Sequence, residues 1–462
     1  MSGHLDDDYL SAPAVAACFN AEAMSRHMLA FEAALAAVGG ELGVIPPAAV
    51  SVIARCADRF VPDYLALREA TVAASNPAIP LVAALTAAVA AEDPEAARYV
   101  HWGATSQDVM DTATMLAARA AGVHLERELE RVCALLSALA DRHRATLLAA
   151  RTLAQLAGPT TFGLRAAGWL AGLAGAQARL RALLPRLPVQ CGGACGTLAA
   201  FGDAGAEVPA RLAGRLGLAP SPPWHTERGM VRELAATLAD ICAAAGKVGS
   251  DLVLMMQREV GELREAAAPG RGGSSALPHK RNPVAAIAVV ACARRAPGEL
   301  ATVFSCFDQW HERAAGAWHA ETPALVSLAK LTGGSLVQLV RALDGLEVDV
   351  AAMRRHLDAD GGVAMSEAVS TALAPALGRA AAQALVRRAA AQAHDSSRPF
   401  GEVLAEYDAV RDHLGVDGLA DALDPGAFLG AADHFVAQAL ARAGAPSPDL
   451  QRRDRAEEDD DG

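Results

Sequence analysis

The sequence predicts an all-α fold in which long helices pack into a bundle. Aromatic residues make up only 4% of the 462 residues, whereas hydrophobic residues make up 52% and alanine dominates many stretches. Alanine is the strongest helix former, because it loses no side-chain entropy on ordering and buries no polar group. Two proline-free stretches, residues 111–150 and 227–268, carry apolar residues at helical spacing. A chain of this length is expected to form more than one domain.

The two long stretches determine the expected architecture. A helix of about forty residues is roughly 60 Å long, and one that is apolar around much of its girth needs other helices to cover it. Before these stretches, residues 1–100 hold short helical segments separated by prolines. Further helices are expected over residues 162–184, 284–307 and 318–343.

Changes in proline content, helical periodicity and polarity along the chain predict three helical domains and a tail. We expect an N-terminal domain over residues 1–106, a central long-helix bundle over 107–347 and a C-terminal domain over 348–443. Residues 444–462 are polar, contain proline and end in an acidic run, so a disordered tail is expected there.

Charge and hydropathy argue against two classes of partner. The net charge is −12, and no basic stripe with interleaved aromatic residues occurs, which argues against nucleic acid. The N-terminus lacks the pattern of a secretion signal, and no stretch is long and uncharged enough to be expected to span a membrane. A cytoplasmic protein without membrane contact is therefore expected.

Cysteine and glycine patterns point to neither a metal nor a cofactor. The eight cysteines are scattered without a C-x-x-C pair, so reduced thiols are expected rather than a disulfide framework. No Cys/His spacing indicates zinc, and no dinucleotide- or phosphate-binding glycine motif occurs.

Two segments beside the first long stretch carry residues suited to binding carboxylates. Residues 101–108 read H-W-G-A-T-S-Q-D and precede the expected helix. Thr105 and Ser106 offer hydroxyls and free amides at its N-terminus, where the helix dipole favours an anion; spacing alone favours a simple capping role. Residues 151–155 follow the stretch and include Arg151, which can bind a carboxylate through two hydrogen bonds or lie on the surface.

A third segment, residues 269–283, is rich in glycine and proline and lies between two expected helices. Glycines there permit the backbone angles and motion of a closing loop. Lysine and asparagine can receive negative charge, and a serine can move a proton; a basic surface loop is the alternative. Its polar side chains are Ser274, Ser275, His279, Lys280, Arg281 and Asn282.

In this order and context, the three segments resemble the motif regions of the fumarase/aspartase superfamily. The third region of that superfamily has the form G-S-S-x-M-P-x-K-x-N-P, and residues 273–283 read G-S-S-A-L-P-H-K-R-N-P. Leu277 replaces the methionine, a change that conserves volume. The resemblance covers about residues 1–440 and implies a three-domain all-α fold. It also implies a homotetramer, in which the central helices complete a 20-helix core and each active site takes motif regions from three subunits.

Carried over by position, the resemblance implies roles for the polar residues. Ser274 would exchange the proton α to a carboxylate. Lys280 and Asn282 would stabilise the enolate-like intermediate, because charge developing beside a carboxylate needs preorganised donors. The residues expected to bind the carboxylates of a small dicarboxylate or tricarboxylate substrate are Thr105, Ser106, Arg151, Gln155, Ser275, Arg281, Arg313 and His101.

Two departures separate this chain from the adenylosuccinate lyases of the superfamily. Those enzymes carry a histidine where this chain has Leu153, and a His-Asp pair where residues 75–77 read S-N-P. Nothing in the sequence places His101 to replace these histidines. A general acid matters when the leaving group is poor, such as an amine, whereas a carboxylate, with a pKa of about 4, needs none. Leu153 is therefore compatible with intramolecular addition of a substrate carboxylate to a double bond.

Within the superfamily, four short stretches of this sequence are most similar to those of bacterial carboxymuconate cycloisomerases. The similar stretches are residues 76–81, 99–108, 160–164 and 316–321. The implied reaction converts 3-carboxy-cis,cis-muconate to γ-carboxymuconolactone, in the β-ketoadipate route of protocatechuate breakdown. A lyase that expels another weak base, such as nitrite from nitrosuccinate, fits the same residues; an adenylosuccinate lyase fits them less well. The retained Ser274, Lys280 and Asn282 argue against a non-catalytic homologue.

Overall fold

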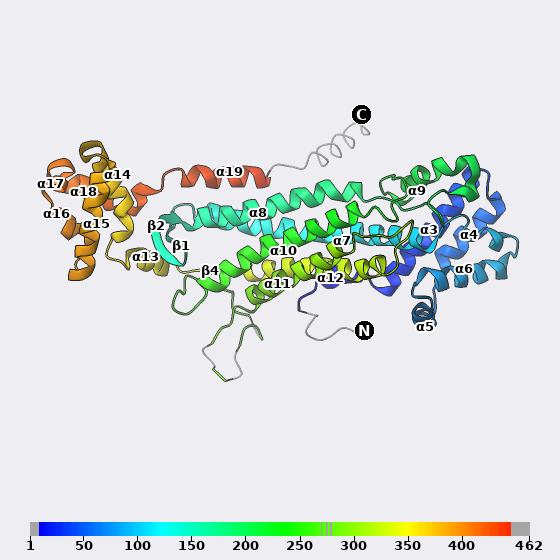
Figure 1. Ribbon diagram of the computed structural model, residues 1–462. Coiled ribbons are helices and arrows are strands. Elements are labelled where there is room, and N and C mark those ends of the chain that lie inside the picture. Colours follow the sequence, from blue (N-terminus) through cyan, green and yellow to red (C-terminus); the bar gives the residue numbers. More distant parts are fainter. Residues whose placement is uncertain (1–8, 269, 274–275, 278–279, 445–462) are drawn as a thin grey trace, which may run out of the picture. The chain divides into compact units, whose positions relative to one another are not determined.

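The computed structural model describes residues 9–268, 270–273, 276–277 and 280–444, and Figure 1 shows its helices and strands. Helices account for 71% of the chain and strands for 4%, so the predicted helical class is confirmed. The predicted tail lies outside the described residues except for residue 444.

The chain divides into two compact units. Unit 1 comprises Met1–Glu130, Gly175–Gly246 and Ala288–Leu339, and unit 2 comprises Arg131–Ala174, Lys247–Ile287 and Val340–Gly462. The division into three domains stays a prediction.

Short helices form the N-terminal part of unit 1. Asn20 caps α3 by accepting a hydrogen bond from the Ala23 amide, and Asp63 caps α5 in the same way. Pro46 and Pro47 stand at the start of α4, where a missing N–H leaves no helical hydrogen bond unmade. Helix α3 packs against α4 and α9, and α4 packs against α6. The short elements of unit 1 are α2 (Pro13–Ala17), α3 (Ala21–Glu41), α4 (Pro47–Arg59), α5 (Tyr64–Ala74), α6 (Ala78–Glu92), η1 (Ala96–Tyr99), η2 (Leu184–Arg186), η3 (Ala199–Glu207) and α9 (Val208–Leu216).

Five long helices contribute residues to both units. In unit 1, Arg181 of α8 donates a 2.9 Å hydrogen bond to Glu126 of α7, and Thr332 of α12 donates one of 3.1 Å to the Leu238 carbonyl of α10. These contacts place α7 beside α8, and α10 beside α12, as a helical bundle requires. The five helices are α7 (Ser106–Arg142), α8 (Phe162–Leu183), α10 (Gly229–Met255), α11 (Val284–Ser305) and α12 (Ala317–Leu343).

Helix α12 is apolar enough to be compared with a membrane span. Among the described residues it alone has the length and composition to cross a bilayer, and 72% of its most apolar stretch is buried within the protein. Such burial is typical of a core helix.

Two long helices are shorter than the sequence predicts, and short strands take their place. Helix α7 ends at Arg142, and the next residues form strand β1 (Leu147–Thr152), which pairs antiparallel with β2 (Gln155–Thr161). Absence of proline permits a helix but does not require one, and pairing between strands decides this segment. Helix α10 ends at Met255, because Gly261 adopts a left-handed φ of 58° and the Glu262 amide bonds back to the Met255 carbonyl. The predicted class stands, and the correction concerns the ends of these two helices.

The C-terminal helices of unit 2 enclose an apolar core of their own. Val369, Phe400 and Leu404 are fully buried in it. Strands β3 (Leu263–Arg264) and β4 (Glu347–Val348) pair antiparallel, which joins the segment after α10 to the segment before α13. The remaining elements are α13 (Val350–Asp358), η4 (Val363–Met365), α14 (Ser366–Leu377), α15 (Arg379–Ser396), α16 (Phe400–Ala405), α17 (Asp408–His413), α18 (Gly415–Leu423), η5 (Pro425–Phe428) and α19 (Ala432–Gly444).

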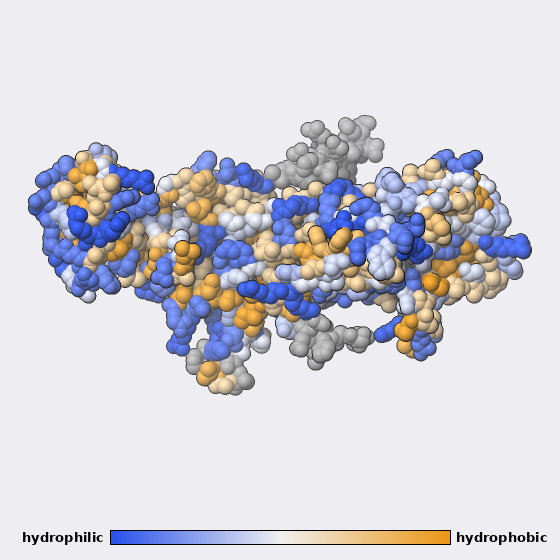
Figure 2. All heavy atoms as spheres, viewed as in Figure 1, coloured by the Kyte–Doolittle hydropathy of each residue, from blue (hydrophilic) through white to orange (hydrophobic). Residues whose placement is uncertain are grey.

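Large apolar side chains are exposed on the long helices and their ends. Figure 2 shows such residues as patches among polar ones on the face that it draws. A monomer that stays in solution rarely exposes large contiguous apolar patches. The exposed apolar residues of these helices include Val123, Leu254, Ile287, Phe304 and Phe307.

Candidate functional site

The loop that leads into α7 is held by one buried carboxylate. Asp108 is fully buried and accepts four hydrogen bonds, from the backbone amides of Thr105 (3.0 Å), Gly192 (3.0 Å) and Gly193 (2.9 Å) and from Nε2 of His225 (2.7 Å). A carboxylate in the first turn of a helix is stabilised by the helix dipole. Asp108 therefore fixes the backbone of Thr105 and leaves its hydroxyl available.

Arg313 meets this loop through neutral oxygens. Its Nη1 donates to Oγ1 of Thr105, its Nη2 to Oγ of Ser106 at 3.3 Å, and its Nε to Oε1 of Gln107 at 3.3 Å. Within the described part of the chain these neutral oxygens, and no carboxylate, are the partners of the Arg313 side chain. We call these four residues the Arg313 cluster; they suit a carboxylate ligand, which a guanidinium binds in bidentate geometry.

A buried charge network lies beside the Arg313 cluster in unit 1. Arg228 is only 2% exposed and donates to both oxygens of Asp111 (2.7 and 2.9 Å) and to Glu321 (3.2 Å). Burial raises the pKa of Glu321, and the pairing with Arg228 opposes that rise. Gln107 donates to Asp111 at 3.3 Å and thereby links the cluster to the network. Because Trp318 also donates to Asp111, the network is held by α7, α12 and the residue that precedes α10.

His101 lies in the same loop as Thr105 and pairs with a residue that the sequence analysis did not single out. Its Nδ1 lies 2.6 Å from Oε1 of Glu32 on α3. The structure thus brings together four expected site residues in unit 1: Thr105, Ser106, Arg313 and His101. It adds Glu32, Asp108 and the buried charge network. For Glu32, Asp111 and Glu321 the sequence signal is a charged residue within an otherwise apolar helical stretch.

In unit 2, Arg151 already has a carboxylate partner. It lies on β1 and donates through both Nη groups to Glu262, at 3.0 and 2.6 Å. Glu262 is fully buried and also bonds Nδ1 of His356 at 2.7 Å. Two of the five guanidinium N–H groups are therefore committed to this pair, and any ligand must use the others.

The hairpin turn after Arg151 is strained. Leu153 and Ala154 both have positive φ, 51° and 65°, in a two-residue turn where asparagine and glycine are usual. Leu153 is 99% exposed, and Gln155, which begins β2, is exposed as well. A strained backbone that presents an exposed leucine is typical of a functional turn rather than of a folding requirement.

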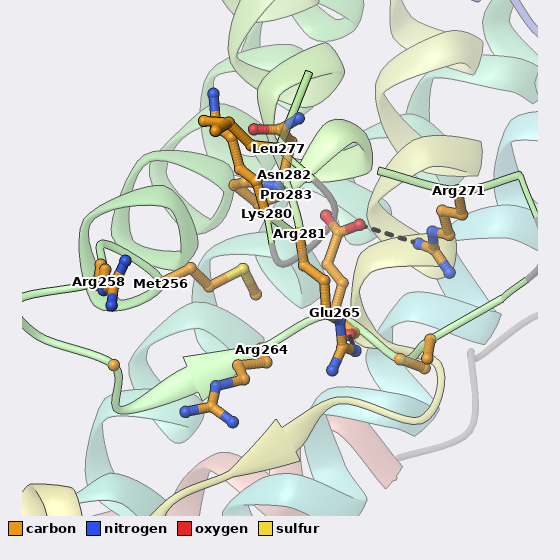
Figure 3. Close-up of a pocket in the computed structure, with 13 residues that line it drawn as sticks. Met256, Arg258, Arg264, Glu265, Arg271, Leu277, Lys280, Arg281, Asn282 and Pro283 are labelled. Atoms are coloured by element: carbon orange, nitrogen blue, oxygen red, sulfur yellow. Dashed lines mark hydrogen bonds and ion pairs between the residues drawn. The ribbon is translucent and has the colours of Figure 1, made fainter. Parts of the chain in front are cut away.

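A cavity of about 620 Å³ lies in unit 2 between the segment after α10 and the glycine-rich segment before α11 (Figure 3). Glu265 is its buried carboxylate: it pairs with Arg271 at 3.3 Å and accepts from the Ala286 amide at 2.8 Å, which caps the start of α11. We call it the loop cavity. Its basic lining residues are Arg258, Arg264, Arg271, Lys280 and Arg281.

The expected loop residues differ in how firmly they are held. The backbone N–H of Asn282 donates to the Gly272 carbonyl at 2.8 Å, and the Arg281 side chain pairs with Glu347 at 3.2 Å. Lys280 is exposed and lines the cavity without an acidic partner in the described segments. Ser274, Ser275 and His279 lie outside the described residues.

No group of three or more His, Cys, Asp or Glu side chains that could hold a metal ion occurs among the described residues. The eight cysteines, all of them described, are free thiols, and only Cys195 is exposed. The absence of a metal and of a cofactor stays a prediction.

Known proteins match this chain along most of its length. The sequence profile described as Lyase matches residues 9–298, and that described as Adenylosuccinate lyase C-terminus matches residues 362–439. A 3-carboxy-cis,cis-muconate cycloisomerase from Bradyrhizobium diazoefficiens is 47% identical over 93% of this chain and 96% of its own. A nitrosuccinate lyase from Streptomyces davaonensis is 44% identical over 89% of each chain. The crystal structure of the 3-carboxy-cis,cis-muconate lactonizing enzyme from Pseudomonas putida matches with a TM-score of 0.89 and 42% identity, covering 96% of this chain and 99% of that one.

Proposed function

The chain belongs to the Lyase family of the fumarase/aspartase superfamily, and we propose that it is a 3-carboxy-cis,cis-muconate cycloisomerase. The observation that carries this proposal is the 47% identity to such an enzyme along nearly the full length of both chains. The reaction would close γ-carboxymuconolactone from its acyclic isomer, in the cytoplasm, without a metal or cofactor.

The reaction makes three changes to the substrate. A substrate carboxylate oxygen forms a bond to one alkene carbon, the alkene electron pair moves towards a second carboxylate, and a proton reaches the carbon next to it. Ser274 delivers that proton, and Lys280 and Asn282 stabilise the negative charge while it lies on the second carboxylate. Because the attacking group belongs to the substrate, no second reactant has to be ordered.

The Arg313 cluster supports a carboxylate-binding role in this reaction. A guanidinium that has no acidic partner among the described residues and is held by neutral oxygens of Thr105, Ser106 and Gln107 is ready to accept an anion. Gln155, Ser275, Arg281 and the free N–H groups of Arg151 complete the expected set. Leu153 supports the same chemistry from another direction, since an exposed leucine cannot act as the general acid that a poor leaving group needs.

We expect a homotetramer with a 20-helix core, in which each active site is completed by three subunits. The exposed apolar residues of α7, α10 and α11 support this expectation, because association would remove them from water. Sedimentation of the purified protein tests it, and a stable active monomer contradicts it.

The alternative is a nitrosuccinate lyase, which the 44% identity to such an enzyme favours. Nitrite, like a carboxylate, is a weak base and leaves without a protein acid. In that reaction the serine would remove a proton from carbon rather than deliver one, and the products would be fumarate and nitrite.

The deciding experiment is a spectrophotometric assay with 3-carboxy-cis,cis-muconate, following loss of the conjugated diene. We expect rapid loss, reduced about 10²- to 10⁴-fold by Ser274→Ala, with Ser396→Ala, at the exposed end of α15, as the matched control. No loss with folded wild-type protein overturns the cycloisomerase, and release of fumarate and nitrite from nitrosuccinate then identifies the lyase.

A further inference from the structure

Glu32 is a buried carboxylate without enough hydrogen bonds. It lies on α3 between the buried side chains of Phe31 and Leu35 and is itself only 2% exposed. Its Oε1 meets Nδ1 of His101, but its equally buried Oε2 has no hydrogen-bond partner among the described residues. Buried polar atoms are nearly always paired, so an exception asks for an explanation. Burial of a carboxylate with one unpaired oxygen costs free energy that an apolar side chain on α3 would not incur, which points to a role other than packing.

His101 has an unusual backbone for its residue type. Its φ is 60°, in the left-handed region that residues other than glycine seldom adopt. The loop turns here, with the Ala104 amide donating to the His101 carbonyl at 3.4 Å. Backbone strain of this kind persists where the surrounding structure requires a side chain to point one way. The side chain is 23% exposed, so one edge of the ring reaches solvent.

The charges around His101 favour the protonated ring. Burial alone would lower its pKa, but the hydrogen bond and negative charge of Glu32 and the charge of Asp108 outweigh burial, and the pKa is raised above 6.5. The other titratable neighbours do not reverse this. Cys191 stays a neutral thiol, because burial and the two carboxylates raise its pKa, and Asp108 is already bonded by His225.

We propose that Glu32 is a positioning residue that keeps His101 as an imidazolium and turns its Nε2–H outwards to bind a substrate carboxylate. Nδ1–H is occupied by Glu32, so Nε2–H is the donor that remains. His101 precedes Thr105 of the Arg313 cluster by four residues in the same loop, which puts two cationic donors in one region of unit 1. The identity of the carboxylate rests on the proposed function; the charge state of His101 and its dependence on Glu32 do not.

A substrate with three carboxylates explains why a second cation is useful here. Arg313 can engage one carboxylate in bidentate geometry. A neutral histidine would offer a weaker hydrogen bond and no charge, and an unpaired histidine would lose its proton near neutral pH. A buried glutamate removes that dependence over the physiological range. In this role His101 binds substrate and does not replace the missing leaving-group acid.

The first test measures the charge state without any assay of turnover. Histidine labelled with ¹³C at Cε1 gives one resonance per ring, and the resonance absent from His101→Gln belongs to His101. We expect it to titrate above the ordinary range in wild-type protein and to fall in Glu32→Gln. Titration at or below about pH 6.5 in the wild type, or no change in Glu32→Gln, overturns the proposal.

The second test measures the consequence for binding. With 3-carboxy-cis,cis-muconate, Glu32→Gln is expected to raise KM about tenfold above neutral pH while kcat changes less than about threefold. The difference in KM between Glu32→Gln and wild-type protein should decrease as the pH falls, because low pH restores the imidazolium of His101 in the variant. Glu32→Asp keeps the charge and should recover part of the loss, whereas His101→Gln should show the high KM at every pH. Glu41→Gln, on the same helix and paired with surface arginines, is the matched control.

Failure of the Glu32–His101 proposal can be distinguished from failure of the proposed reaction. If the protein does not turn over 3-carboxy-cis,cis-muconate, the affinity for tricarballylate replaces KM as the readout. It is measured by calorimetry on wild-type and Glu32→Gln protein. Weaker binding in Glu32→Gln that recovers at low pH supports the dyad even then. An equal loss of kcat and of binding at all pH values, with no recovery in Glu32→Asp, indicates a purely structural Glu32 and overturns the proposal.

Discussion

The Arg313 cluster of unit 1 and the loop cavity of unit 2 contain similar cationic groups in different surroundings. Around Arg313 the supporting charges are buried and multiply bonded: Asp108 accepts four hydrogen bonds, and Arg228 is enclosed by two carboxylates. In the loop cavity Lys280 is exposed and lacks an acidic partner among the described residues, and the one acidic partner of Arg281, Glu347, is exposed. Arg281 also donates to the Glu265 carbonyl at 2.8 Å.

This difference is the one expected if the Arg313 cluster binds the substrate and the loop cavity holds the groups that act on it. A group that must recognise a carboxylate benefits from a fixed position, because no free energy is then lost in ordering it. A group that must follow charge as it moves from carbon to carboxylate is useful on a segment with few fixed contacts, as in closing loops. We therefore expect changes around Arg313 to affect stability and binding, and changes in the loop cavity to affect turnover.

The largest expected effect is on stability, from Arg228→Met. The change leaves Asp111 and Glu321 buried without their cation and should lower the free energy of unfolding by about 3–5 kcal/mol. Urea unfolding followed by circular dichroism measures it. Arg281→Met in the loop cavity removes an exposed pair and should lower it by less than about 1 kcal/mol. Similar losses in the two variants would break the comparison.

The next effect is on turnover, from Lys280→Met. Loss of the cation that meets the developing charge should lower kcat about 10²- to 10³-fold. Unfolding should be unchanged, since Lys280 has no ion-pair partner in the described structure. Steady-state kinetics and the urea midpoint are measured on the same preparation. A wild-type kcat would remove Lys280 from the proposed chemistry.

A smaller effect, on binding, is expected from Arg313→Gln. A hydrogen bond to a charged group contributes about 1.5–3 kcal/mol, so KM should rise roughly 30-fold while kcat falls less. Arg313→Lys should not restore KM, because an ammonium cannot reproduce the fork that meets Thr105, Ser106 and a carboxylate together. If kcat alone falls, the division between the two regions is wrong.

The smallest effect concerns pH and sharpens the description of unit 1. Because the pKa of His101 is raised on folding, its pairing with Glu32 stabilises the protein fully below about pH 6.5 and is lost as the pH rises through the raised value. Wild-type protein should therefore lose stability relative to His101→Gln between mildly acidic and alkaline pH. Urea midpoints of both proteins across this range test the sign, and parallel curves contradict it.

Much of the fold was predictable from local sequence. The helix expected over residues 162–184 spans Phe162–Leu183, and that expected over 318–343 spans Ala317–Leu343. The prediction was wrong after Arg142, where a hairpin replaces the helix, since helical and strand tendencies of a short apolar run differ too little to decide. The turn at Gly261 was missed for a similar reason: a single glycine gives no sign of which helical stretch it will end.

The sequence by itself determined the helical class, the order of the three motif segments and the residue types that they hold, because helix formation depends on neighbours three and four positions apart and motifs are contiguous. Only the tertiary structure decided which charges meet. Glu32 and His101 lie 69 residues apart in the chain, and Asp111 and Arg228 lie 117 apart. Such pairs form because packing brings distant helices together and excludes water between them, and no periodicity along the chain encodes which side chains will then face one another.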